Sequence, residues 1–215
     1  MLKIPKSTNR RRCESEIRVV AISGSLRVTS YTNMALEVAL AGATQAGAQT
    51  SLLNLRDFDL QFAGLADGED GASSGLARLS QIVRGAHGIL LGTPEYHGSL
   101  SGVLKNALDL MGFDEFEGKM IGLVGVSAGR MGAFDALNTL RNVGRALHAW
   151  VVPEQVSIPE VSRVFSKNGE LLDRAIGERL LHLGTRVAEF AKLHECGRDR
   201  EFVSSWEAAM ENPGG

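Results

Sequence analysis

Short apolar runs alternate with longer segments of helical periodicity along most of the chain. The runs predict five β-strands, at 17–22, 51–55, 88–93, 120–126 and 149–156. Apolar positions three and four residues apart predict helices at 34–46, 76–84, 101–111, 133–147 and 173–194. A parallel crossover requires a helix and is right-handed, so this order predicts an α/β fold with a parallel sheet and helices on both faces.

Two regions fit this alternation poorly. The segment 56–75 is acidic and Gly-rich, and it is long for a connection, which makes it either functional or mobile. The segment 159–172 carries no clear pattern apart from a turn at 167–169.

Composition favours one globular domain. A chain of 215 residues with 44% hydrophobic residues can bury a full core, and no transmembrane span is expected. We expect a flexible arm at 1–15, the folded domain at 16–195 and a tail at 196–215. The formal charge of -2 argues against nucleic-acid binding and favours small-molecule chemistry. Cys13 and Cys196 lie far apart without metal spacing, so we interpret them as unpaired thiols of a cytoplasmic protein.

The loop after the first strand has the composition of a phosphate site. Ser25, Ser30 and Thr32 would donate hydroxyl groups, and Arg27 would supply a positive charge. A helix beginning near Asn33 would add free amides at its N-terminus. Neither the GxxxxGK nor the GxGxxG pattern is present, which favours a terminal phosphate held by side chains. The alternative is that these residues only cap the helix.

The loop after the third strand suits a planar ligand. Residues 94–99 follow an apolar strand and precede a helix, and they combine an exposed backbone with the aromatic Tyr96. In a parallel sheet such a loop lies at the carboxyl ends of the strands, where ligands bind. Tyr96 could equally be a half-buried loop aromatic.

The loop after the fourth strand matches the GxSxG pattern around Ser127. Between a strand and a helix, this pattern is also typical of a hydrolase nucleophile. Asp135 or Asp173 could then orient His182 or His194. Both histidines fall on a predicted helix rather than on a loop, which disfavours a catalytic triad.

The three loops together resemble the NAD(P)H-dependent FMN reductases, a family that includes quinone and chromate-type reductases. The resemblance rests on Gly24-Ser-Leu-Arg with Ser30, on Pro94-Glu-Tyr-His97 and on Leu104-Lys-Asn-Ala-Leu-Asp109, and it extends over about 17–191. The chain departs from the family pattern at His97, where Asn is usual, and at Ser101, where Pro is common.

This resemblance implies a flavodoxin-like three-layer sandwich with strand order 2-1-3-4-5. It implies noncovalent FMN, a hydride taken from NADPH or NADH at flavin N5, and electrons passed to a quinone, free flavin, an azo compound or a metal oxyanion. It also implies a homodimer or homotetramer and no catalytic acid or base. The FMN-binding residues carried over are Ser25, Leu26, Arg27, Ser30, Tyr31, Thr32, Asn33, Pro94, Glu95, Tyr96, His97, Gly98, Ser127, Ala128 and Gly129.

Several alternatives stay open. A flavin-binding electron carrier is disfavoured because the chain is nearly neutral and Tyr96 is the single aromatic residue of the two loops expected at the ring. A serine hydrolase based on Ser127 is the other alternative. Glu95 could be a turn carboxylate or a subunit contact, and Arg130 could bind a nucleotide phosphate or face water.

Overall fold

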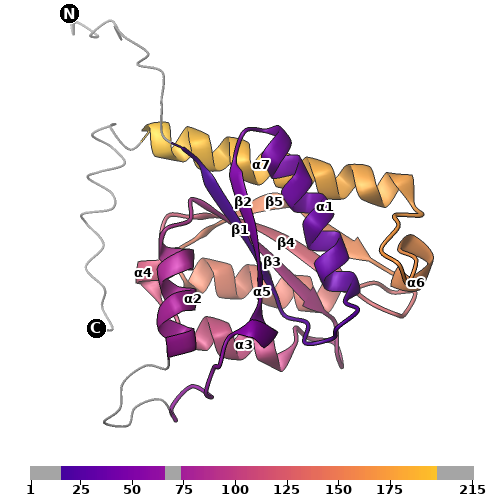
Figure 1. Ribbon diagram of the computed structural model, residues 1–215, viewed down its shortest axis with the longest axis horizontal. Helices are drawn as coiled ribbons and strands as arrows, with labels where there is room; N and C mark the ends of the chain where they lie inside the picture. Colours follow the sequence, from indigo (N-terminus) through magenta and orange to yellow (C-terminus); the bar gives the residue numbers. More distant parts are fainter. Residues whose placement is uncertain (1–15, 66–73, 198–215) are drawn as a thin grey trace, which may run out of the picture.

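The computed structural model describes residues 16–65 and 74–197. Within these residues one parallel sheet has the order β2-β1-β3-β4-β5, so the predicted α/β fold and its strand order are confirmed (Figure 1). Its strands are β1 (Arg18–Ser23), β2 (Gln49–Asn54), β3 (Gly88–Pro94), β4 (Met120–Val126) and β5 (Trp150–Ile158).

Helices cover both faces of the sheet. In Figure 1, α1 and α7 lie on one face, and α2, α3 and α5 lie on the other. The helices are α1 (Tyr31–Gln45), α2 (Ser74–Arg84), α3 (Gly102–Asp109), α4 (Phe113–Phe116), α5 (Phe134–Ala146), α6 (Val161–Val164) and α7 (Arg174–Gly197), with a 3₁₀ turn, η1, at Leu55–Asp57. The sequence did not predict α4 and α6, because a single turn is too short to display helical periodicity.

The central strands separate two cores. Every residue of β3 and β4 is buried. Alternate side chains of β1 point to opposite faces, so Val19 packs with α1 and α7 while Val20 packs with the α2 and α5 layer. Burial on both faces explains why these strands are continuous apolar runs in the sequence.

Helices α1 and α7 pack backbone against backbone through two glycines. A Cβ atom added to Gly184 would overlap the carbonyl oxygen of Ala39, and one added to Gly42 would overlap that of Leu181. Thr185 Oγ1 also donates to Gly42 O at 3.1 Å. The last helix therefore fixes the position of α1, whose N-terminus lies at the carboxyl ends of the strands.

A buried carboxylate joins α2 to α4. Glu115 accepts hydrogen bonds from Ser80 Oγ at 2.6 Å, Gly112 N at 2.9 Å and Arg84 Nη2 at 2.8 Å. Burial alone raises the pKa of Glu115, but these donors outweigh it and hold the pKa below its ordinary value. The carboxylate is thus a structural acceptor on the face opposite α1.

The chain ends are described only in part. The predicted arm at 1–15 lies outside the described residues, as does most of the predicted tail at 196–215. Cys196 is disulfide-bonded, so its interpretation as an unpaired thiol was wrong, and the thiol argument for a cytoplasmic location is lost. Among the described helices none has the length and apolar character needed to cross a membrane.

Candidate functional site

Three loops meet in one cavity at the carboxyl ends of β1, β3 and β4. We name them the first loop (24–30), the second loop (95–101) and the third loop (127–133). The cavity, called the central hollow below, has a volume of about 380 Å³. Its lining residues are Ser25, Arg27, Tyr31, Thr32, Pro94, Glu95, Tyr96, Val126, Ser127, Ala128, Gly129, Val161 and Ser162.

The first loop is held by hydrogen bonds at both ends. Gly24 N donates to Gly92 O of β3 at 2.8 Å, and Ser30 Oγ caps α1 by accepting from Asn33 N at 3.2 Å. Because Ser30 is the cap, α1 begins at Tyr31, three residues earlier than predicted. The backbone amides of Tyr31 and Thr32 therefore have no acceptor within the helix.

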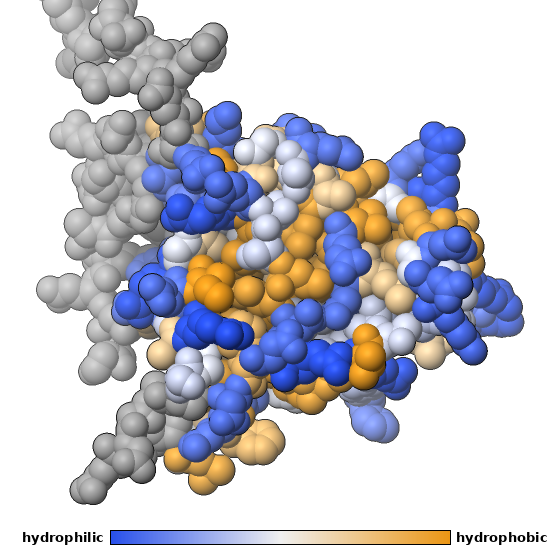
Figure 2. Space-filling view, in the orientation of Figure 1, coloured by the Kyte–Doolittle hydropathy of each residue, from blue (hydrophilic) through white to orange (hydrophobic). Residues whose placement is uncertain are grey.

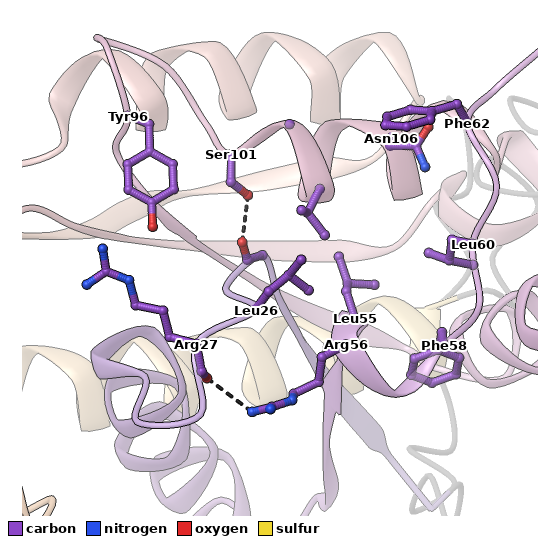
Figure 3. Close-up of a pocket in the computed structure, with 13 residues that line it drawn as sticks. Leu26, Arg27, Leu55, Arg56, Phe58, Leu60, Phe62, Tyr96, Ser101 and Asn106 are labelled. Atoms are coloured by element: carbon purple, nitrogen blue, oxygen red, sulfur yellow. Dashed lines mark hydrogen bonds between the residues drawn. The ribbon is translucent and has the colours of Figure 1, made fainter.

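The first loop also brings positive charge to the central hollow. Arg27 is the one cation among the described lining residues, and Figure 3 shows its side chain directed toward Tyr96. The partial positive charge at the start of α1 acts in the same direction. Hydroxyls from Ser25 and Thr32 complete a donor set that suits a phosphate dianion.

The second loop turns sharply at its tip. Tyr96 N donates to Ser99 O at 3.0 Å and Ser99 N donates to Tyr96 O at 3.1 Å. His97 and Gly98 lie between them with φ of 52° and 74°, a turn with two left-handed residues. Asn and His are both enriched in this conformation, so the turn accepts His97 where the family usually has Asn.

Glu95 connects the second loop to α5. Its Oε2 accepts from Ala136 N at 3.0 Å, in the first turn of that helix. The carboxylate thus contacts a helix 41 residues away in sequence rather than its own turn, and a role in a subunit contact stays a prediction. The contact holds the second loop beside the third, because α5 begins where the third loop ends.

The third loop folds back on its own serine. Ser127 Oγ accepts from Gly129 N at 3.0 Å, and Ser127 N donates to Ile158 O at 2.9 Å. Ser157 Oγ accepts from Ala133 N at 2.8 Å and fixes the start of α5. The loop therefore presents backbone amides and a small hydroxyl to the central hollow.

None of the acids and histidines of the hydrolase alternative lines the central hollow with Ser127. His194 lines a cavity with Arg18 and Lys119, at the amino ends of the strands and thus opposite Ser127. His182 lies beside Glu154 and Arg179. The geometry therefore does not support a triad on Ser127.

The structure divides the predicted FMN-binding residues into two groups. Those that line the central hollow are Ser25, Arg27, Tyr31, Thr32, Pro94, Glu95, Tyr96, Ser127, Ala128 and Gly129. The others do not line it: Ser30 caps α1, Asn33 Oδ1 accepts from Ser23 Oγ, His97 and Gly98 form the turn, and Leu26 lines a neighbouring cavity. All fifteen stay predictions as flavin ligands.

Sequence reasoning missed part of the wall of the central hollow. Val161 and Ser162 of α6 line it, although they belong to a segment without a clear pattern. Glu160, in front of them, has a φ of 40° and pairs with Arg130 Nε at 3.7 Å. The Arg130 side chain is 84% exposed, so it is available at the rim.

The chain is similar to characterised proteins over most of its length. Residues 17–163 match the model of the NADPH-dependent FMN reductase family. An NAD(P)H-dependent FMN reductase from Pseudomonas aeruginosa is 35% identical over 167 residues, which cover 74% of this chain and 86% of that protein. An FMN-dependent NADPH-azoreductase from Staphylococcus aureus is 34% identical over 155 residues, covering 68% and 78%.

Similarity in three dimensions extends to the flavodoxins. A flavodoxin from the domain Archaea superposes with a TM-score of 0.58 at 14% identity, covering 82% of this chain and 99% of its own. At this identity the likeness concerns the fold alone. The family match and the sequence relatives show more: the chain belongs to the NADPH-dependent FMN reductase family, whose members are enzymes.

Proposed function

We propose that this protein binds FMN noncovalently in the central hollow and uses it to pass electrons from NADPH or NADH to a quinone or another small oxidant. The observation that carries the proposal is the convergence of a cationic, hydroxyl-rich first loop and two backbone-exposing loops in one cavity. Family membership implies FMN and NAD(P)H as the redox pair. An azo compound is a further candidate acceptor, given the azoreductase relative.

The donor set of the central hollow fits FMN. Arg27, Ser25 and the amides at the start of α1 would hold the terminal phosphate. The backbone of the second loop and Tyr96 would bind the ring, whose faces are apolar and whose edge carries hydrogen-bonding groups. Amides of the third loop would approach the ring from the other side and stabilise negative charge on it.

The chemistry belongs to the cofactor. When bound, FMN accepts a hydride from the nicotinamide and returns two electrons to the second substrate. For a quinone the balance is NADPH + H⁺ + quinone → NADP⁺ + hydroquinone. The residues of this chain bind and orient, and no side chain is required as a catalytic acid or base. We expect a homodimer or homotetramer, as the family resemblance implies.

Acceptor-dependent oxidation of NADPH tests this function. We expect the FMN-loaded protein to oxidise NADPH under nitrogen rapidly when 1,4-naphthoquinone is added, and slowly without it. The assay follows the loss of nicotinamide absorbance, with protein freed of FMN as the control. An electron carrier would show no direct oxidation of NADPH at catalytic protein concentrations. Covalent labelling of Ser127 by a fluorophosphonate would support the hydrolase instead.

A further inference from the structure

A second and larger cavity lies beside the central hollow. This side chamber, with a volume of about 770 Å³, opens between the first loop, the start of α3 and the segment 55–62. Its apolar wall is made of Leu26, Leu55, Phe58, Leu60, Phe62 and Val103. A cavity of this size and character is typical of sites that bind an organic molecule with several rings.

Hydrogen bonds fix the wall of the side chamber. Asn106 Nδ2 donates to Gln61 O at 2.9 Å, and Asn106 Oδ1 accepts from Ala63 N at 3.0 Å. This amide therefore ties the segment that carries Leu60 and Phe62 to α3. Ser101 Oγ donates to Gly24 O at 2.7 Å and joins the first loop to the start of α3 (Figure 3). The segment 58–63 is thus shaped by tertiary contacts.

Large apolar side chains of the side chamber are open to solvent. Phe62 is 70% exposed and Leu26 is 52% exposed. Figure 2 shows apolar side chains among polar ones along the lower border of the molecule, where these segments lie in Figure 1. Exposed apolar surface beside a hollow is typical of a ligand-binding groove.

The charged residues that line the described side chamber are all positive. Arg27 and Arg56 line it, and no carboxylate is found among the described lining residues. Arg56 Nη1 donates to Arg27 O at 3.2 Å, which leaves its other guanidinium N–H groups for a ligand. If Arg27 holds the FMN phosphate, Arg56 is the cation that remains for a second molecule. Guanidinium groups pair well with planar anions and stack on aromatic rings.

The two cavities share a wall. Arg27 and Tyr96 line both the central hollow and the side chamber. A molecule in the side chamber would therefore lie next to a flavin in the central hollow.

We infer that the side chamber binds the electron acceptor, and that the preferred acceptor is an aromatic quinone with an anionic substituent. The rings pack among Leu26, Leu60 and Phe62, and the anion lies beside Arg56. This inference rests on the proposed function. The quinone takes up two electrons and two protons and leaves as the hydroquinone, and NADPH with one proton supplies them.

Binding is tested without electron transfer by naphthalene-2-sulfonate, which has the ring and the anion but is not a quinone. We expect calorimetry on the oxidised, FMN-loaded protein to show one saturable site. Arg56→Gln should weaken binding about tenfold, which corresponds to about 1.4 kcal/mol. The matched control is Arg174→Gln, which removes an equal charge from a side chain 92% exposed on α7 and should leave binding unchanged.

Steady-state kinetics test whether the side chamber is where the electron acceptor binds. With 1,4-naphthoquinone-2-sulfonate, Arg56→Gln should raise KM about tenfold, whereas KM for uncharged 1,4-naphthoquinone should change less than twofold. Phe62→Ala should raise KM for both quinones about threefold. Its side chain is exposed, so the variant should fold like the parent, and a thermal melt checks this.

Other outcomes separate this inference from the proposed function. Equal effects of Arg56→Gln on both quinones, or the absence of saturable binding, would overturn the assignment of the side chamber while leaving the reductase intact. Weaker FMN binding in Phe62→Ala would assign the chamber to the flavin itself and also overturn it. Failure of NADPH to reduce bound FMN would refute the proposed function, and the acceptor role with it, even if naphthalene-2-sulfonate binds.

Discussion

Replacing Arg27 with alanine should weaken FMN binding about tenfold to a hundredfold. Arg27 is the cation of the described central hollow, and a hydrogen bond to a charged group contributes about 1.5–3 kcal/mol. Its side chain is exposed in the first loop, so its removal should not disturb the core. Quenching of FMN fluorescence during titration of the protein freed of cofactor measures the change.

Two comparisons sharpen this test. Riboflavin, which lacks the phosphate, should bind the parent and Arg27→Ala with similar affinity. Arg174→Ala should bind FMN like the parent, because Arg174 does not line the central hollow and its side chain pairs with Glu178 at 2.7 Å. FMN affinity unchanged in Arg27→Ala would remove this residue from the phosphate site.

Replacing Gly184 with alanine should lower the free energy of unfolding by about 3 kcal/mol, at the upper end of the cost of overpacking. In an exposed helix the same change would stabilise, since alanine is the better helix former. Here the added methyl group would overlap the carbonyl oxygen of Ala39 and force α1 and α7 apart. For a domain of this size, we expect the melting temperature to fall by roughly 6–12 °C.

A matched glycine separates crowding from helix propensity. Gly102 begins α3, and a Cβ atom there would have no neighbour within 4 Å. We therefore expect Gly102→Ala to leave the melting temperature unchanged or slightly raised. A Gly184→Ala variant as stable as the parent would show that the helices are not in backbone contact at this point.

Much of the fold could be predicted because its sheet is parallel and buried. Every residue of β3 and β4 is buried, and Thr93 is the one polar side chain in them. Such nearly continuous apolar runs can be recognised in the sequence without knowing which elements pack against them. The start of α1 was misplaced because apolar periodicity begins at Met34, whereas the start of the helix is set by the hydroxyl of Ser30. The first residue of α1 is thus determined by a capping hydrogen bond, which the spacing of hydrophobic residues does not indicate.

The parts of the site that could be predicted are those in which the binding residues follow directly after a strand. The first and third loops bring Arg27 and Ser127 to one hollow because each follows a parallel strand. The side chamber could not be foreseen, because Leu60 and Phe62 line one cavity with Val103 as a result of tertiary hydrogen bonds from Asn106 to the segment that carries them. The long connection at 56–75 was the single sequence signal of it.

The central claim is that the chain holds FMN and that NADPH reduces it there. The most direct measurement is the visible absorption spectrum of the protein reconstituted with FMN, freed of excess cofactor and titrated with NADPH in the absence of oxygen. We expect bound-flavin bands that bleach in proportion to added NADPH, one equivalent for each flavin. A protein that retains no FMN, or whose flavin bands persist with excess NADPH, would contradict the account.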